Sequence, residues 1–333
     1  MRSARLTLAL ETGAVVLPDA GSIVVYRPRA ADDLSALPKD RLLLVQGFRP
    51  DHDALAAQGY RVAVAGGSGH AAAVVCLPRA RAEARALLAE ATAAVEPGGL
   101  IVVDGQKTDG IEAVWRDLAE RLAVSATLSK AHGKLFTLAA EPGLEDWAAR
   151  PAEIVGGFRT LPGIFSADAP DRGSQLLLEA LPADLSGRVV DLGAGWGFLA
   201  RAVLGRRAVK RIDLVEAEHA ALDCARLNIT DERAHFHWAD ATRFRLSKPA
   251  DVVVCNPPFH TTREADPTLG MGFLQAAARL LAPSGLLWLV ANRHLPYDRG
   301  LRALFREVEE IGGDAAFRIV RAARPQRTAG TSA

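Results

Sequence analysis

Two pairs of similar segments recur in the same order in the two halves of the chain, and this repetition constrains the fold more than any other feature. The first pair is H-A-A-A-V-V-C-L-P at residues 70–78 and A-D-V-V-V-C-N-P-P at residues 250–258. The second pair is E-P-G-G-L-I-V-V-D-G-Q-K at residues 96–107 and A-P-S-G-L-L-W-L-V-A-N-R at residues 282–293. In each half an Ala-, Arg- and Leu-rich helical segment lies between the two apolar runs. This order favours duplication of one α/β unit, although any two α/β domains share a strand, helix, glycine turn and strand.

The second half alternates β-rich runs with helical patterns, which predicts a parallel sheet covered by helices. The predicted elements are strands at 188–192, 211–216, 235–238, 251–255 and 286–291, helices at 218–227 and 272–281, a glycine turn at 312–313 and a last strand at 317–321. A length of 333 residues fits two domains. We therefore expect two tandem α/β domains at residues 1–150 and 151–333, connected through residues 141–170.

The first copy lacks residues that the second copy places after its strands. Leu77 stands where the second copy has Asn256. A glycine-rich stretch occurs at residues 65–69, but it directly precedes the strand that contains Cys76, which is the wrong place in the order. We therefore expect the N-terminal domain to be degenerate, without a cofactor loop, and retained for docking or substrate binding.

The strongest cofactor signal is V-V-D-L-G-A-G-W-G-F-L at residues 189–199, a strand that ends in a glycine-rich turn and opens a helix. Glycines allow a tight turn and a close approach of a ligand to the backbone. The G-x-G-x-G spacing differs from the dinucleotide pattern, so it favours a nucleoside with an amino-acid tail over a pyrophosphate. The candidate binding residues of this loop are Asp191, Gly193, Ala194, Gly195 and Gly197.

Two acidic residues follow the next two predicted strands. Glu216, followed by Ala217, ends the strand about 20 residues after the loop, where a carboxylate can accept hydrogen bonds from a ribose diol. Asp240, followed by Ala241, ends the third strand and can accept a bond from an adenine amino group. Ligands of open parallel sheets bind at the carboxyl ends of the strands, where both acids fall.

The tetrapeptide Asn256-Pro257-Pro258-Phe259 follows a buried strand directly and carries the candidate chemistry. Asn256 is also a candidate cofactor-binding residue. Two prolines stiffen the bend and remove backbone donors, so its carbonyls can face outward. The Asn256 amide oxygen and a carbonyl near the prolines can then accept both protons of a flat NH₂ group, which directs the nitrogen lone pair toward an incoming methyl group. Phe259 can stack on a planar substrate. A proline turn with a capping asparagine is the structural alternative.

Together these motifs resemble the class I, Rossmann-like methyltransferases that modify exocyclic or amide nitrogens. Within this class the chain is similar to the bacterial ribosomal RNA guanine-N2 methyltransferases of the two-domain, duplicated type. The resemblance covers residues 155–323 and is thinner in the first half, where it rests on the shared plan and S-K-A-H-G-K-L-F at 129–136. The further matching motifs are L-P-G-I-F-S at 161–166, D-R-G-S-Q-L-L-L at 171–178 and V-A-N-R-H-L-P-Y at 290–297.

The resemblance implies two tandem Rossmann-like methyltransferase domains, of which the N-terminal one is inactive. It implies S-adenosylmethionine as cofactor and a guanine 2-amino group in ribosomal RNA as substrate. The motifs favour 16S RNA of the small subunit, and large-subunit RNA stays open as the alternative because the two family branches share these motifs. It also implies that Ser166, Asp171 and Gly173 cover the methionine end of the cofactor.

Several alternatives stay open. A methyltransferase of adenine N6 or of a protein glutamine amide shares the tetrapeptide, and a small-molecule methyltransferase would need a lid. A non-catalytic RNA-binding factor in ribosome assembly would need neither the glycine loop nor Asn256.

Overall charge and composition argue against other classes of protein. The net charge of +1 gives no global attraction to nucleic acid, so RNA binding needs local patches. One candidate is the run Arg318, Arg321, Arg324 and Arg327, with a solvated strand edge as the equal alternative. Three widely spaced cysteines without a C-x-x-C pair argue against disulfides and zinc. No apolar run has the length of a membrane span or a signal peptide, so we expect no membrane association. We further expect a protein of the reducing cytoplasm that is a monomer and needs no metal.

Overall fold

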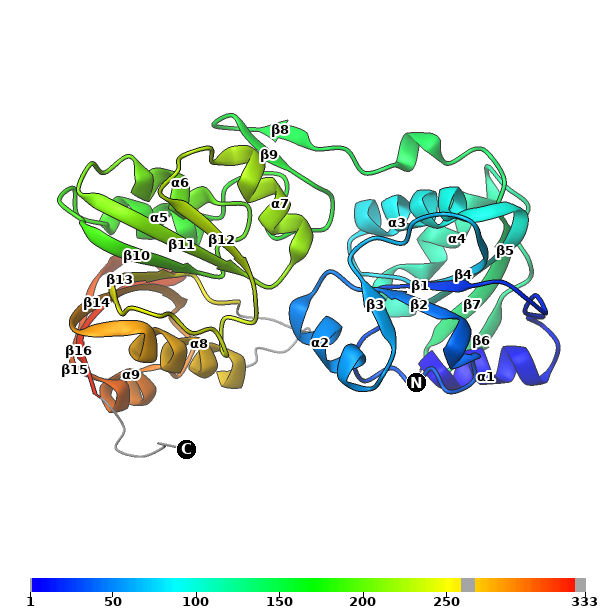
Figure 1. The fold of residues 1–333 in the computed structure, drawn as a ribbon, viewed down its shortest axis with the longest axis horizontal. Helices are drawn as coiled ribbons and strands as arrows, with labels where there is room; N and C mark the ends of the chain where they lie inside the picture. The colour runs from blue at the N-terminus through cyan, green and yellow to red at the C-terminus, as the bar shows by residue number, and fades with distance from the viewer. Residues whose placement is uncertain (1, 259–266, 327–333) are drawn as a thin grey trace. The chain divides into compact units, whose positions relative to one another are not determined.

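The computed structural model describes residues 2–258 and 267–326 and divides the chain into two compact units (Figure 1). Unit 1 comprises Met1–Arg150 and Leu161–Gly163, and unit 2 comprises Pro151–Thr160 and Ile164–Ala333. A short part of the connecting segment therefore packs with unit 1.

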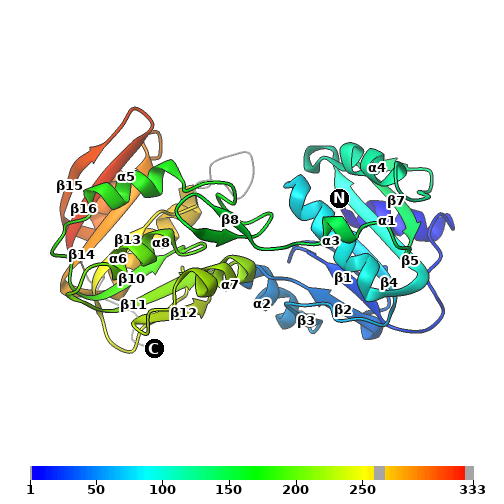
Figure 2. The same cartoon turned by 90° about the horizontal axis from the view of Figure 1, so that it is seen from above.

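Unit 1 contains one sheet with helices on both faces (Figure 2). Leu6 of α1 and Leu55 of α2 pack on one face, and Leu88 of α3 and Val114 of α4 pack on the other. The elements are α1 (Arg2–Glu11), β1 (Ile23–Tyr26), β2 (Leu42–Val45), α2 (Arg49–Ala57), β3 (Arg61–Ala63), β4 (His70–Cys76), α3 (Arg81–Ala94), β5 (Val95–Gln106), α4 (Ile111–Ala119), β6 (Leu128–Lys130) and β7 (Gly133–Ala139).

Unit 2 has the same layered plan. Leu177 of α5 and Leu199 of α6 pack on one face of its large sheet, and Leu274 of α8 and Leu301 of α9 pack on the other. The elements are β8 (Ala152–Ile154), β9 (Phe158–Thr160), α5 (Arg172–Ala180), β10 (Gly187–Leu192), α6 (Phe198–Leu204), β11 (Val209–Glu216), α7 (His219–Asn228), β12 (Ala234–Trp238), β13 (Ala250–Cys255), α8 (Pro267–Leu280), β14 (Leu281–Asn292), α9 (Asp298–Leu304), β15 (Phe305–Gly313) and β16 (Phe317–Pro325).

The two large sheets have equivalent strand orders. Unit 1 has the order β3-β2-β1-β4-β5-β7-β6, and unit 2 has β12-β11-β10-β13-β14-β16-β15. In both, five parallel strands are followed by an antiparallel pair. The prediction of two tandem Rossmann-like α/β domains is therefore confirmed.

The strand registers also match and define equivalent positions in the two units. Ile23 pairs with Leu42 and Ala72 in unit 1, as Val189 pairs with Ile212 and Val252 in unit 2. Counting along each strand from these pairs gives the partners of the four chemically important positions of unit 2. Asp191, Gly193, Glu216 and Asn256 correspond to Val25, Arg27, Gln46 and Cys76.

This register corrects the sequence alignment at one position. Leu77 was expected at the position equivalent to Asn256. In the structure Ala72 pairs with Leu100 as Val252 pairs with Leu286, so Ala72 and Val252 are equivalent. Counting along both chains from these two residues makes Cys76 the equivalent of Asn256. The sequence comparison had matched the two V-V-C runs by similarity, whereas the sheet aligns them one residue apart.

Unit 1 retains parts of the loop geometry without its chemistry. Arg27 has a left-handed backbone (φ +56°) at the position of Gly193 (φ +77°), and both N–H groups donate to the equivalent carbonyl, of Val45 and Val215 respectively. The Gln46 amide oxygen accepts the N–H two residues later, as the Glu216 carboxylate does. Among the described residues, no α-helix lies between β1 and β2, where unit 2 has α6.

The predicted strands and helices of the second half are all present, but β15 was not predicted. Its sequence F-R-E-V-E-E-I-G-G is mostly charged, and it forms the exposed edge of the sheet, so it lacks the apolar run of a buried strand. Gly312 and Gly313 belong to the end of this strand rather than to the turn itself, and Asp314 begins the turn.

An ion pair buried in unit 1 fixes helix α1 to the sheet. The Arg5 guanidinium donates to both carboxylate oxygens of Asp104 on β5, at 2.7 and 2.8 Å, and both side chains are almost fully buried. Arg5 also donates to the carbonyl of Lys130. A buried charge pair of this kind is destabilising when one partner is removed, because the other charge is left uncompensated.

We expect Asp104→Ala to lower the free energy of unfolding by about 3–5 kcal/mol, because Arg5 stays buried without its counterion. Arg49→Ala breaks the exposed Arg49–Asp53 pair on α2 and serves as the control, with an expected loss of about 0.5 kcal/mol. Urea unfolding followed by circular dichroism measures both. Equal losses in the two variants would contradict the structural role of the buried pair.

Candidate active site at the carboxyl edge of the unit 2 sheet

The candidate residues of unit 2 gather at one edge of its sheet because their strands are parallel and in register. Leu192 pairs with Val215 on one side and with Cys255 on the other. The residues that follow these three positions, Gly193, Glu216 and Asn256, therefore leave the sheet side by side.

The glycine loop turns back on β11 immediately after β10. The N–H groups of Gly193 and Ala194 both donate to the carbonyl of Val215, at 2.9 and 3.1 Å. Gly193, Gly195 and Gly197 all have positive φ angles, which favour glycine. At Gly193 a Cβ would lie 3.4 Å from the Phe273 ring and 3.7 Å from the Asn256 carbonyl, so a side chain there would fill the space between the loop and the tetrapeptide.

The Glu216 carboxylate ties the loop to the end of β11. One oxygen accepts the N–H of Gly195 at 2.8 Å, and the other accepts the N–H of Glu218 at 2.7 Å. The side chain is partly exposed at the rim, and loss of water around the carboxyl raises its pKa. Each oxygen retains a lone pair, so Glu216 can still accept hydrogen bonds from a ligand.

Asp191 lies beneath the loop, fully buried near the end of β10. The backbone of Ala200 acts on the carboxyl and lowers its pKa, but neither carboxylate oxygen makes a hydrogen bond of normal geometry with the described residues. Burial raises the pKa of Asp191 to about 7, and the nearby charge of Glu216 adds to this shift. A buried carboxyl without a partner and with such a pKa suits a cationic ligand group, which would favour its ionised form.

Asp240 and Ala241 follow β12, and Ala217 follows β11. One Asp240 oxygen accepts from the backbone N–H and the hydroxyl of Thr242, at 2.9 and 2.6 Å, which orients the carboxylate. The other oxygen lies 3.7 Å from the exposed Arg243 guanidinium. The Ala217 carbonyl accepts the indole N–H of Trp238, which fixes the backbone beside Glu216.

Asn256 is held in one orientation by the start of α5. Its Nδ2 donates to Asp171 Oδ2 at 2.9 Å and to Ser174 Oγ at 2.8 Å, whereas its buried Oδ1 has no partner among the described residues. Pro257 is buried and Pro258 is exposed. Phe259 lies outside the described residues.

A hollow of about 50 Å³ lies between the glycine loop, the start of α5 and Asn256. Five of its lining residues were not proposed as site residues from the sequence: Phe165, Ser174, Trp196, Phe198 and Leu199. The Trp196 indole donates to the Phe165 carbonyl at 3.0 Å, and its ring packs 4.8 Å from that of Phe158. Asp171 caps α5 by accepting the backbone N–H of Ser174. This N-cap pattern is the one feature of the sequence that could have drawn attention to Ser174.

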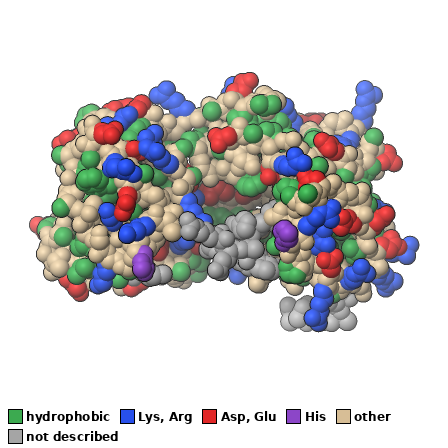
Figure 3. All heavy atoms as spheres, turned by 180° about the vertical axis from the view of Figure 1, so that it is seen from behind, with side chains coloured by type: hydrophobic (Ala, Val, Ile, Leu, Met, Phe, Trp, Pro, Cys, Tyr) green, Lys and Arg blue, Asp and Glu red, His purple; other side chains and the backbone are tan. Residues whose placement is uncertain are grey.

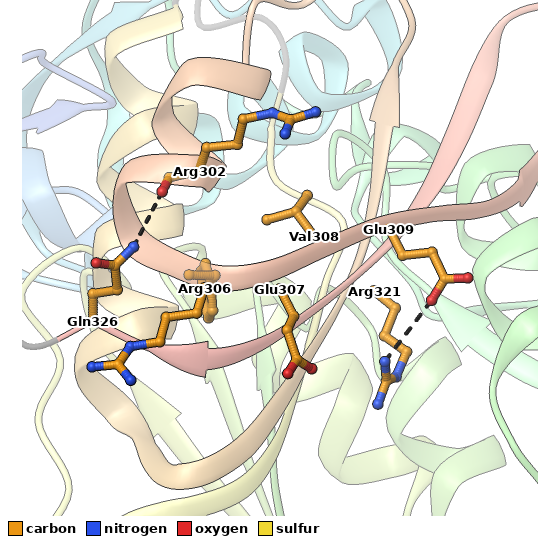
Figure 4. A pocket seen from close by; sticks show the side chains of 8 residues that line it. Arg302, Arg306, Glu307, Val308, Glu309, Arg321 and Gln326 are labelled. Atoms are coloured by element: carbon orange, nitrogen blue, oxygen red, sulfur yellow. Dashed lines mark hydrogen bonds and ion pairs between the residues drawn. The ribbon is translucent and has the colours of Figure 1, made fainter.

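A second hollow, of about 570 Å³, lies beside β15 and α9 (Figure 4). Arg321, which belongs to the arginine run considered as an RNA-binding patch, lines this hollow. Arg321 pairs with Glu309 and Arg324 pairs with Glu307, while Arg318 pairs with Asp298. Arg327 lies outside the described residues. The acids of β15 therefore neutralise much of the run, which favours the solvated strand edge over an RNA patch.

The charge distribution elsewhere is mixed. Basic and acidic side chains are interspersed over the face of each unit seen in Figure 3. In the part of the chain that the structure describes, His, Cys, Asp and Glu side chains form no group of three that could hold a metal ion. The three cysteines are buried and form no disulfide. No helix within residues 2–258 and 267–326 is long and apolar enough to cross a membrane.

Comparisons with known proteins identify relatives of this chain. A family model described as the methyltransferase small domain matches residues 156–321. The ribosomal RNA small subunit methyltransferase C of Alteromonas mediterranea is 30% identical over 264 residues, which are 76% of this chain and 73% of the relative. The ribosomal RNA large subunit methyltransferase G of Aeromonas hydrophila is 31% identical over 165 residues, but these are only 48% of this chain and 43% of the relative.

A solved structure resembles the whole fold. It is a T. thermophilus 16S rRNA N2 G1207 methyltransferase in complex with AdoMet and guanosine. The TM-score is 0.80 at 24% identity, and the match covers 97% of this chain and 91% of that chain. Because the match spans both units, the two-unit fold itself is shared.

Alanine at two loop glycines tests how tightly the loop is packed. Gly195→Ala has open space and loses only the left-handed backbone preference (φ +54°), so we expect the free energy of unfolding to fall by about 1 kcal/mol. Gly197→Ala shares this strain (φ +90°) and also places its Cβ 2.8 Å from Ile229 Cδ1, which adds about 1–3 kcal/mol. Urea unfolding compares the two. A loss at Gly195 equal to that at Gly197 would contradict the packing described.

Proposed function

The chain belongs to the family of ribosomal RNA small subunit methyltransferase C proteins, and from this premise we propose that unit 2 methylates a guanine of 16S ribosomal RNA. The methyl group comes from S-adenosylmethionine, and the acceptor is the exocyclic 2-amino group of the base. The observation that carries the proposal is the buried Asn256 Oδ1, which faces a glycine-rich ligand loop and has no partner among the described residues.

The loop and the two strand-end acids fit S-adenosylmethionine. Gly193, Ala194, Gly195 and Gly197 leave the backbone accessible, Glu216 suits the ribose hydroxyls, and Asp240 with Ala241 suits the adenine. Asp191 suits the ammonium group of the methionine part, because its carboxylate is buried and makes no ion pair with the described residues. The hollow of about 50 Å³ takes only part of such a ligand. The nucleoside would then lie outside it, beside Glu216 and Asp240.

Asn256 holds the amino group of the guanine. Its Oδ1 accepts one N–H, and a carbonyl in the Pro257-Pro258 bend accepts the other. The lone pair of the 2-amino nitrogen is delocalised into the ring, and holding both protons directs it out of the base plane. When bound, S-adenosylmethionine supplies a methyl carbon activated by its sulfonium. Asp191, Glu216 and Asp240 would hold the cofactor so that its methyl group would be transferred to the nitrogen that Asn256 positions, and one amino proton would be released to water.

The small subunit is favoured over the large subunit by the extent of similarity. The small-subunit relatives match across about three quarters of this chain, whereas the large-subunit relatives match over about half of it. The substrate specificity of a two-unit enzyme depends on both units, so the longer match is the more informative one.

Unit 1 is proposed to dock the RNA rather than to bind cofactor. Val25 replaces the buried carboxylate, and the Arg27 guanidinium pairs with Glu83 at 3.1 Å in place of an open glycine loop. One chain therefore supplies one catalytic unit and one docking unit, which is consistent with a monomer. Ribosomal RNA as substrate implies a cytoplasmic location.

Purified protein incubated with methyl-labelled S-adenosylmethionine and small subunits or naked 16S RNA from an unmodified strain should label one RNA as N2-methylguanine. Asn256→Ala should lower the rate by at least 100-fold while cofactor affinity changes little, because the lost acceptor serves only the substrate. Nucleoside analysis by mass spectrometry identifies the product.

The same assay separates the alternatives. Label in large subunits, in N6-methyladenine or in protein would replace the 16S guanine assignment. Full complementation of a deletion strain by Asn256→Ala would show that RNA binding, and not methylation, is the relevant role.

Cofactor binding should strengthen as pH rises toward neutrality. Asp191 is protonated below its pKa of about 7 in the free protein, and only the carboxylate attracts an ammonium group. In the folded protein Asp191 keeps its proton up to about pH 7, whereas in the unfolded chain it loses the proton near its usual pKa of 3.8. The stability of the cofactor-free protein therefore falls as the pH rises between these two values. Bound cofactor, which favours the ionised carboxylate, restores more stability at the higher pH. We expect the affinity to rise about tenfold from pH 5.5 to 7.5, as measured by calorimetry.

Asp191→Asn is the control, because it keeps the shape and removes the titration. Its affinity should be lower at pH 7.5 and should vary much less over the same range. An equal pH dependence in both proteins would assign the effect to another group.

A further inference from the structure

The orientation of the Asn256 amide decides what this side chain can do. An amide group offers two N–H donors on one side and an oxygen acceptor on the other, and a half-turn exchanges them. With Oδ1 toward the hollow, the residue accepts from a substrate N–H. After a half-turn it would present two donors to an amino group that itself carries protons, and the contact would be repulsive.

The start of α5 favours one of these two orientations. Asp171 Oδ2 and Ser174 Oγ lie 2.9 and 2.8 Å from Asn256 Nδ2, so both N–H groups have acceptors. After a half-turn, Oδ1 would face the Asp171 carboxylate, and two oxygens without a proton between them repel. The favoured orientation leaves Oδ1 in the hollow.

The clamp is itself fixed by the backbone. The same Asp171 Oδ2 accepts the N–H of Ser174 at 2.9 Å and thereby caps α5. Gly173 lies between them, and a Cβ there would be 3.0 Å from Asp171 Oδ2 and 3.2 Å from the Phe317 ring. The cap and the close approach together hold two acceptors in place for a residue 85 and 82 positions away in the sequence.

We propose that Asp171 and Ser174 are positioning residues that lock the Asn256 amide with its oxygen toward the amino group of the substrate. This inference rests on the proposed function. It adds a role to Asp171, for which the resemblance implied only a cover over the cofactor, and assigns a role to Ser174, which was not a candidate from the sequence. A buried acceptor without a partner is energetically unfavourable, so the Asn256 amide would otherwise tend to rotate and direct its oxygen elsewhere. Asp171 and Ser174 prevent this rotation until the substrate supplies an N–H to the oxygen.

Three variants separate this role from helix capping. Asp171→Ser keeps a good N-cap residue but withdraws the carboxylate from Asn256. Ser174→Ala removes the second acceptor and leaves the cap intact. Gln175→Ala is the matched control, because this neighbour in the first turn of α5 donates to the Pro170 carbonyl, whereas the Asn256 amide bonds to Asp171 and Ser174.

The kinetic test uses single-turnover methylation of 16S RNA under saturating cofactor. Asp171→Ser and Ser174→Ala should each lower the rate about tenfold, with thermal midpoint and cofactor affinity close to those of the parent protein, whereas Gln175→Ala should change none of these. Weaker cofactor binding at an unchanged saturated rate would overturn the proposal, because it would show direct cofactor contacts instead.

The effect of Asp171→Ser should also change sign with the residue at position 256. Asn256→Asp places two carboxylates in contact and should be nearly inactive at pH 8. Adding Asp171→Ser relieves this repulsion and should raise the rate at least fivefold, although the same change lowers it beside Asn256. A loss in both backgrounds would indicate a purely structural role and would overturn the proposal.

A second readout does not depend on the methylation activity. The chain has three asparagines, Asn228, Asn256 and Asn292, so ¹⁵N-asparagine labelling gives few side-chain amide signals. The Asn256 amide protons should exchange slowly with solvent, and at least tenfold faster in the Ser174→Ala/Asp171→Ser protein. Asn228 is the internal control, because its amide donates to the carbonyls of Arg159 and Trp196 in every variant.

The two readouts distinguish the possible failures. Protected Asn256 protons in a protein that methylates no RNA would refute the proposed function and keep the lock. Unprotected Asn256 protons in an active parent protein would refute the lock and keep the function.

Discussion

The hydrogen bond from the Gly195 N–H to the Glu216 carboxylate connects the two parts on which the site depends, the glycine loop and the end of β11. It exists because β10 and β11 are parallel neighbours in register, so the loop after one strand lies against the last residue of the next. The loop in turn leaves space for Phe273 and for the Asn256 carbonyl. Moving β11 by one residue would separate the loop from Glu216, and moving β13 would separate it from Asn256.

Local patterns made much of this predictable. Buried strands such as β10 and β13 are continuous apolar runs, and the parallel order brings the residues that follow them to one edge. β15 was missed because an exposed edge strand with Glu307, Glu309 and Glu310 has no such run. The contact between Ser174 and Asn256 could not be predicted from the sequence. The capping motif indicates where α5 begins, but it does not indicate which distant residue packs against it.

The matching registers of the two sheets separate residues that the fold requires from residues that only the chemistry requires. Arg27 keeps the left-handed backbone of Gly193, and Gln46 keeps the bond that Glu216 makes to the N–H two residues later. These features hold the chain as it leaves β1 and β2, so they persist in unit 1. The side chains of Asp191 and Asn256 do not hold the backbone in this way. Unit 1 has Val25 and Cys76 at the equivalent positions.

The same comparison explains why the sites of unit 2 are energetically unfavourable in the absence of ligands. Asp191 and Asn256 Oδ1 are buried polar groups without partners among the described residues, and each is destabilising relative to the apolar residue that unit 1 has there. A sheet with the same strand order folds in unit 1 without either group. Their presence in unit 2 is therefore not explained by folding, and the hydrogen bonds that they lack are those that a cofactor ammonium and a substrate amino group can supply.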